Sequence, residues 1–295
     1  MRPVGHFQGV PYAVGLAPRA KDYLVIGVIM IIAVMISLDA APARAQSLNF
    51  ASENSDEPIE IFAEDGIEWE QEAHTFTARG NARAVRGAVV VRGDVLRAYY
   101  RDKTGGGAEI RRLDAEGHVH ITTPAEEAFG ETATYDVGKS ILVLRGSKVR
   151  LIAGDDTISA NQQLELWENK KMAVARGNAY AVRQDRRLRA NVLTAHYRKN
   201  KAGKSEVYRV EAFGEVYILL AKDIVTADRG IYNVESGIAT LTGSVKITRN
   251  QNQLNGCSAE VNLKTGFSKL NSCGSTKSGK ERVRGLLQPG GVKKN

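Results

Sequence analysis

An internal repeat with a period of 97 residues constrains the fold of this 295-residue chain more than any other feature. The motif Arg79-Gly80-Asn81-Ala82 recurs as Arg176-Gly177-Asn178-Ala179, and the glycine pairs Gly117 with Gly214 and Gly146 with Gly243 keep the same spacing. Self-similarity at a fixed period is typical of architectures built from stacked units. Although the length alone allows two domains, the repeat predicts one continuous body.

The residues between these glycines predict β-strands. Apolar and polar residues alternate after them, as in Gly117-His-Val119-His-Ile121, and Val, Ile, Thr and Tyr are frequent. A period of two is the signature of a strand, and no helical period is sustained after residue 46. Pro124 is the only proline between residues 59 and 273, which suits a backbone that donates its N–H groups to ladders. We expect an elongated all-β fold with about fourteen antiparallel strands.

The first 45 residues predict export. An uncharged segment, residues 24–38, follows basic residues and precedes Ala43-Arg44-Ala45, which is typical of a secretory signal cleaved after Ala45. An uncleaved signal anchor is the alternative, although this segment is shorter than the roughly 20 apolar residues that span a bilayer. A polar linker, residues 46–58, then leads to the repeat domain at residues 59–275. The rest of the chain is therefore expected to be exported.

The excess positive charge lies at the two ends of the chain. Of the formal net charge of +8, residues 1–45 hold +2 and residues 276–295 hold +5, so the repeating body holds only +1. A nearly neutral body argues against a nucleic-acid partner. The basic tail, residues 276–295, is expected to be disordered and solvated, with contact to anionic head groups as the alternative.

Two segments carry a resemblance to a known family. The first is Ile61-Phe-Ala63-Glu-Asp65-Gly66-Ile67-Glu-Trp69, leading to Gly80-Asn81, and the second runs from Val225-Thr-Ala227-Asp228 through Tyr232 to Leu241-Thr-Gly243-Ser-Val245. They resemble the OstA-type repeat of the LptA family of periplasmic lipopolysaccharide-transport proteins, and the likeness covers about residues 59–288. The resemblance implies an open β-jelly roll whose two sheets form a V-shaped trough for the acyl chains of lipid A. It also implies head-to-tail pairing of end strands, which bridges inner-membrane and outer-membrane export components of similar jelly-roll fold.

The alternation within the strands predicts which side chains face into the trough. Shielding each CH₂ group of an acyl chain from water is worth about 0.8 kcal/mol, so an apolar inner face suits such a ligand. Ordinary core packing is the alternative for each position. The expected inward side chains are Ile61, Trp69, Phe76, Val119, Ile121, Tyr135, Leu142, Leu144, Leu151, Ile158, Leu166, Tyr197, Val216, Ile218, Tyr232, Leu241, Val245, Ile247 and Leu263.

Two polar groups are further candidates. Arg79, Arg83 and Arg86 belong to an arginine-rich segment, and we expect them to form a rim that meets lipid phosphates, or otherwise a solvated strand face. His118 and His120 have the spacing of residues that share one face of a strand. No third ligand lies near them in the sequence, so we expect no metal site.

Cys257 and Cys273 are symmetric about Thr265 in a predicted turn. In a simple hairpin they would lie opposite each other, within reach of a disulfide bond, which export permits. A bulge or a crossover between sheets would instead separate them. No catalytic or cofactor-binding motif is present in the sequence. We therefore expect that the protein binds no cofactor and is not an enzyme.

Three functions follow in order of preference. The first is a periplasmic carrier that binds lipopolysaccharide and passes it from the inner to the outer membrane, alone or as a head-to-tail homo-oligomer. The second is a scaffold resembling the LptC component, held in the inner membrane by residues 24–38. The third is an enzyme that processes envelope polysaccharide, for which no convergent site is visible.

Overall fold

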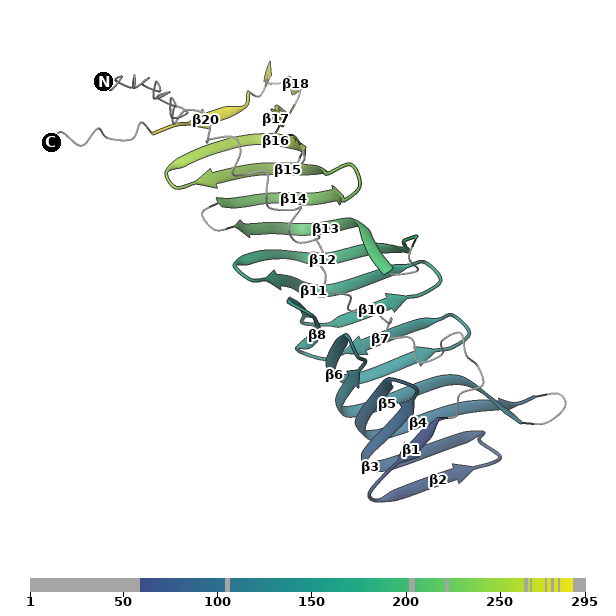
Figure 1. Cartoon of the computed structure of the whole chain (residues 1–295). Helices are drawn as coiled ribbons and strands as arrows, with labels where there is room; N and C mark the ends of the chain where they lie inside the picture. Colours follow the sequence, from purple (N-terminus) through teal and green to yellow (C-terminus); the bar gives the residue numbers. More distant parts are fainter. Residues whose placement is uncertain are drawn as a thin grey trace, which may run out of the picture.

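The computed structural model describes residues 59–103, 107–201, 205–220, 223–262, 265, 267–273, 275–276, 279–280 and 282–288. Within these residues the chain is all β, with an 18-stranded antiparallel sheet and a separate pair formed by β18 (Ser275–Thr276) and β19 (Gly279–Lys280). Figure 1 shows the strands stacked along one long axis, from β1 and β2 at one end to β16, β17 and β20 at the other. The expected elongated all-β fold is confirmed. The expected export signal, the linker and Leu263 lie outside the described residues.

Neighbouring strands in the sheet are mostly neighbours in the chain. The first half of the main sheet contains β1 (Glu60–Phe62), β2 (Gly66–Glu70), β3 (Thr75–Arg86), β4 (Val89–Asp102), β5 (Ala108–Thr122), β6 (Glu126–Asp136), β7 (Ile141–Arg145), β8 (Val149–Ala153), β9 (Asp156–Ala160) and β10 (Gln163–Trp167). The second half contains β11 (Met172–Arg183), β12 (Arg186–Lys199), β13 (Ser205–Leu220), β14 (Asp223–Asn233), β15 (Ile238–Arg249), β16 (Asn252–Asn262), β17 (Ser268–Asn271) and β20 (Arg284–Leu286). The bounds of β11 and β12 lie 97 residues after those of β3 and β4, so the repeat of the sequence is a repeat of strands.

The repeat glycines mark the line along which the long strands bend, here called the crease. At Gly80 and Asn81 in β3, both residues have positive φ, 78° and 43°, and the pairing with β4 shifts register between Arg79 and Ala82. The same geometry recurs at Gly117, Gly177, Gly214 and Gly243, each followed by a second residue with positive φ. Glycine adopts this left-handed conformation without steric cost, and the one extra residue in β3, where Gly80 and Asn81 lie opposite Asp94, bends the strand as a β-bulge does. The spacing of the glycines therefore reflects a bulge in every second strand.

The crease divides the sheet into two arms. Arm A contains β2, β7, β10 and β17, arm B contains β1, β8, β9 and β20, and the long strands run through both. A long strand that passes from one arm to the other is called a crossing of the crease. At four crossings, two short strands take the place of one long bent strand: β1 with β2, β7 with β8, β9 with β10, and β17 with β20. When each of these pairs is counted once, the eighteen strands reduce to the expected fourteen.

The core follows the inside of the crease, where the arms converge. The first inward residue after each bend is small and 0–2% exposed: Ala82, Val119, Val149, Ala179, Val216 and Val245. Larger inward side chains, such as Ile121, Leu142 and Tyr135, lie farther from the crease, because the space between the arms widens there. The two arms thus share one apolar core.

Part of the expected disordered tail is ordered. Residues 284–286 form β20, which pairs with Gln253–Asn255 of β16. Without β20, the arm B half of β16 would expose an unpaired edge, and unpaired edges attract further strands. The tail of the chain therefore supplies the last strand of arm B.

Candidate functional site

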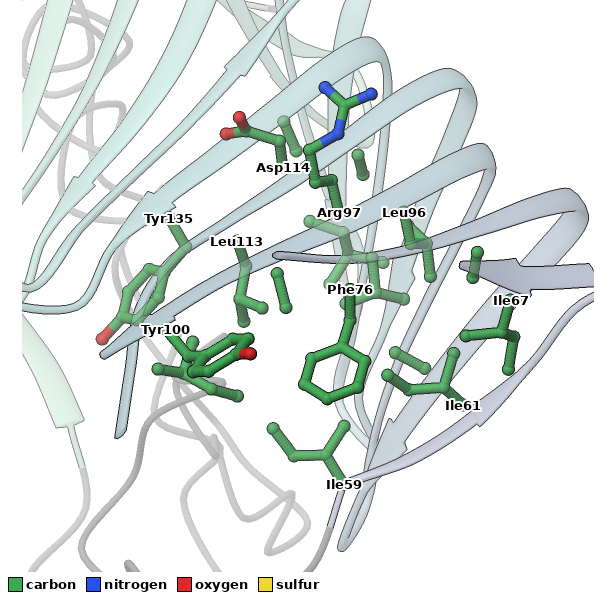
Figure 2. Close-up of a pocket in the computed structure, with 18 of the residues that line it drawn as sticks. Ile59, Ile61, Ile67, Phe76, Leu96, Arg97, Tyr100, Leu113, Asp114 and Tyr135 are labelled. Atoms are coloured by element: carbon green, nitrogen blue, oxygen red, sulfur yellow. The ribbon is translucent and has the colours of Figure 1, made fainter. Parts of the chain in front are cut away.

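The inner faces of the two arms form an apolar trough, and a cavity of about 380 Å³ opens in it between β1 and β7. Both arms supply its walls, as Figure 2 shows: Ile61 comes from arm B, whereas Phe76, Leu113 and Tyr135 come from arm A. Two charged residues at the wall, Arg97 and Asp114, direct their side chains away from this apolar space. The cavity has the size and the lining of a small-molecule site.

Most of the predicted inward side chains face the core. Among them, Val119, Ile121, Tyr135, Leu142, Leu144, Val216, Ile218, Tyr232, Leu241, Val245 and Ile247 are buried. Ile61, Leu151, Ile158 and Leu166 are partly buried and pack against the same core, and Phe76 and Tyr197 have intermediate exposure. Direct contact of these residues with a lipid stays a prediction.

Trp69 is one of the predicted inward residues, but its side chain is 58% exposed. It lies on β2, directly opposite Phe76 of β3, and the two rings stack with centroids 5.2 Å apart. Its Nε1–H donates a hydrogen bond of 2.8 Å to the hydroxyl of Tyr100. Trp69 therefore faces the inner side, but β2 is the first described strand of arm A, and no other described strand covers the indole.

Alanine residues make up much of the inner face, and the sequence analysis missed them. Ala78, Ala115, Ala175 and Ala212 on arm A are each 2–4% exposed. The alternation Ala82-Arg-Ala84 after the first repeat motif carries the signal, because its alanines share a strand face with the larger apolar residues. Small side chains leave room between the arms, so they contribute to the width of the trough.

Acidic side chains also face inward, at the outer ends of the arms. On arm B, Asp156 pairs with Arg183 and Asp223 pairs with Arg249, with Nε–Oδ1 distances of 2.5 Å in both pairs. A third acid on this arm, Glu126, has no such partner, and burial raises its pKa to about 7. The sequence analysis missed Glu126, although it lies 97 residues before Asp223 and so occupies the equivalent position.

Glu168 is the corresponding buried acid on arm A. Its Oε2 accepts a hydrogen bond of 3.4 Å from the hydroxyl of Tyr135, and Oε1 is buried with no hydrogen-bond partner among the described residues. Burial raises the pKa of Glu168, more than the bond from Tyr135 and the charge of Lys171 lower it. Glu168 begins the turn after β10, and nothing in the sequence of this turn indicates that the residue is buried.

The three arginines predicted to form a phosphate rim do not lie together. Arg79 faces outward beside the crease, with its Nη2 3.4 Å from Oε2 of Glu68. Arg83 also faces outward and lies over the ring of Phe62, 4.4 Å from its centroid. Only Arg86 shares the strand parity of the inward Ala84 and lies at the end of β3. The expected rim of three arginines is therefore wrong, because strand alternation places two of them on the outer face.

The two histidines have different partners. His118 is a crease residue with a φ of 48°. Nδ1 of His118 lies 2.9 Å from Oδ2 of Asp94, whereas the ring of His120 stacks on Phe129 at 4.3 Å. Within the described ranges, no group of three or more His, Cys, Asp or Glu residues is placed to hold a metal ion.

A disulfide bond joins Cys257 of β16 to Cys273, with a Cα–Cα distance of 4.8 Å. The pairing of β16 with β17 places Ser258 opposite Asn271, so the two cysteines are offset by one residue from the symmetric hairpin of the sequence analysis. The bond fixes the chain after β17 to the last long strand of the sheet.

Large apolar side chains are exposed at both ends of the sheet. At the first end, Phe62 and Ile67 are 46% and 51% exposed, and at the other end Leu286 is 53% exposed. Among the described strands, β1 and β2 pair only with β3, so their outer edges offer unpaired backbone groups. Such edges are templates for pairing with another chain. No helix in the described part of the chain is long and apolar enough to cross a membrane.

Comparison with known proteins assigns the family. The family model described as LptA/(LptD N-terminal domain) LPS transport protein matches residues 61–162 and again residues 157–267. These two successive matches follow the internal repeat and cover most of the chain. The chain therefore belongs to this lipopolysaccharide-transport family, as its resemblance to the OstA-type repeat predicted.

Two individual proteins are similar to it. An uncharacterized protein of Rhizobium meliloti (strain 1021) is 26% identical over 136 residues, which are 44% of this chain and 71% of the relative. The crystal structure of LptH from Pseudomonas aeruginosa, described as the LptA-homologous periplasmic component of the lipopolysaccharide transport device, matches at 11% identity with a TM-score of 0.20. That match covers 79% of this chain and 96% of LptH.

Proposed function

We propose that this protein is a periplasmic carrier that holds the acyl chains of lipopolysaccharide between its two arms and passes the lipid from the inner towards the outer membrane. The observation that carries the proposal is the apolar inner face, which opens into a cavity of about 380 Å³. Contacts in such a trough are non-directional, so a chain can slide along them. A carrier needs no catalytic group, and we propose no chemical step.

Photo-crosslinking at two adjacent positions tests the trough. Leu113 lines the cavity, whereas Arg112 faces outward and its Nε donates to Oδ1 of Asp114 at 2.8 Å. A photoreactive side chain at position 113 is expected to capture lipopolysaccharide, and the same group at position 112 is not. Equal capture at both positions, or capture at neither, would contradict binding between the arms.

We further propose that the free sheet edges join copies of the protein, or partners of similar jelly-roll fold, head to tail. The exposed apolar residues at both ends and the unpaired edges of β1 and β2 support this assembly. Leu286→Lys places a charge at the last edge, where lysine discourages strand pairing. Ile224→Lys is the matched control, because Ile224 is 36% exposed in the same cross-strand row of an interior strand. Sedimentation equilibrium is expected to show weaker self-association for the first variant only.

The alternative is a scaffold that stays anchored in the inner membrane by residues 24–38. Sequencing the amino terminus of the exported protein separates the two functions. A chain that starts at Gln46 supports the free carrier, and an intact start supports the anchored scaffold.

A further inference from the structure

Four polar side chains come together inside the apolar trough: Glu126 from arm B, and Tyr135, Glu168 and Tyr197 from arm A. We call them the mouth cluster. Tyr135 donates its hydroxyl hydrogen to Glu168. Burial, together with the negative charges of Glu168 and Glu126, raises the pKa of Tyr197 to about 12. The direct contact in this cluster is the hydrogen bond between Tyr135 and Glu168, and Tyr197 lies within the electrostatic reach of Glu168 and Glu126.

The repeat shows that the acid at position 126 departs from the pattern of its own fold. Its equivalent, Asp223, is neutralised by Arg249, which lies directly opposite on the adjacent strand. The residue opposite Glu126 is Ala153, and no cation of the described chain lies within 4.0 Å of the Glu126 carboxylate. The second unit closes this position with an internal ion pair, whereas the first unit leaves the carboxyl group available.

Glu168 provides the independent observation that points to a ligand. The residue is only 9% exposed, yet its Oε1 is buried without a hydrogen-bond partner among the described residues. A buried acceptor without a donor is costly. A hydrogen-bond donor that enters the trough would remove this cost, whereas the acceptor oxygens of a phosphate would not, and each carboxyl group that is ionised would repel them.

The mouth cluster adjoins the cavity through Tyr135. The ring of Tyr135 forms part of the cavity wall, and its hydroxyl points away from the apolar space (Figure 2). If the alkyl chain of a ligand occupies the cavity, the polar group attached to that chain would therefore lie near Tyr135 and Glu168. Oε1 of Glu168 is the buried acceptor without a partner at this point, so a hydrogen-bond donor is the group that fits it.

We propose that the mouth cluster binds a hydrogen-bond donor, a hydroxyl or an ammonium group, that the amphiphile in the trough carries next to its alkyl chain. This inference rests on the proposed function, because it assumes that alkyl chains occupy the trough. It goes beyond that function by naming the polar chemistry that accompanies the chain.

Calorimetric titration of the purified protein with three decyl compounds tests the proposal. Decylamine and 1-decanol carry donors, whereas decyltrimethylammonium carries the charge without an N–H group. We expect decylamine and decanol to bind about tenfold more tightly than decyltrimethylammonium. Glu168→Leu is expected to abolish this preference, and Tyr135→Phe gives a second test if the first variant does not fold. Glu127→Leu is the matched control, because Glu127 faces outward beside Glu126 and pairs with His120.

The outcomes separate the two proposals. If no decyl compound binds, the trough does not take alkyl chains, and the proposed function is wrong. If all three bind equally and the Glu168 and Tyr135 variants change nothing, the trough stands and the mouth cluster is no donor site. If decyltrimethylammonium binds as tightly as decylamine, charge alone is recognised, which overturns the donor chemistry.

Discussion

Replacement of Gly80 by alanine tests whether close backbone approach shapes the crease. Gly80 has a φ of +78°, and a Cβ atom there would lie 2.5 Å from Cγ and 2.8 Å from the backbone nitrogen of Asp65. That nitrogen donates to the carbonyl of Arg79 at 3.0 Å, so it cannot withdraw without breaking the bond. The substitution must therefore displace the start of β2 from β3.

The expected loss has two parts. A left-handed conformation costs an alanine about 1–2 kcal/mol, and overpacking adds about 1–3 kcal/mol, so Gly80→Ala is expected to lose about 2–5 kcal/mol. Gly154→Ala is the matched control: its φ is +56°, and nothing lies within 4 Å of a Cβ built there. This control should lose only the first part, about 1–2 kcal/mol.

Urea unfolding followed by tryptophan fluorescence measures both losses. Trp69 stacks on Phe76 of β3, so in a Trp167→Phe background its emission reports the strands beside Gly80. We expect a lower midpoint and a more exposed Trp69 for Gly80→Ala than for Gly154→Ala. Equal losses in the two variants would refute the close-approach account of the crease.

Three further perturbations have defined outcomes. Burial raises the pKa of Glu126 from 4.5 to about 7, so its favourable contribution is complete below about pH 4.5 and is lost as the pH rises through 7, by about 3 kcal/mol. Glu126→Gln should therefore flatten the fall in urea midpoint between pH 5 and 8.5, and an unchanged fall would assign it to other groups. Cys257→Ser opens a disulfide with a sequence separation of 16 and should cost about 3 kcal/mol; a midpoint insensitive to reductant in the parent protein would contradict this. Val216→Ala empties space around a residue that is 2% exposed and should cost about 2 kcal/mol in the same assay, whereas a loss near zero would mean that the crease core is loosely packed.

The sequence predicted the fold because its two main signals are local. Positive φ at the glycines sets the period, and strand alternation sets the inner face, so neither needs knowledge of distant contacts. Strand alternation also assigns the arginines to a face of the sheet, because Arg79 and Arg83 differ in parity from the inward Ala82 and Ala84. Strand parity alone therefore excludes a rim that contains all three arginines.

Other features depend on what lies across the trough or beyond the last strand. The burial of Glu168 arises from its contact with Tyr135, 33 residues away, and no spacing rule reveals it. The exposure of Trp69 arises because β2 has no neighbour on its outer side among the described strands. Alternation assigns a residue to a face, but the degree of burial on that face is a property of the assembled sheet.

The six crossings from β3 to β10 have a consequence for how such a protein changes length. Neighbouring strands lie about 4.8 Å apart, so one 97-residue unit lengthens the trough by about 29 Å. Because six is even, the chain leaves the unit on the same arm and in the same direction as it entered. A duplicated unit can therefore be inserted between its neighbours without reversing a strand or creating a new type of contact. A duplication within the gene can therefore change the length of the trough in steps of one whole unit.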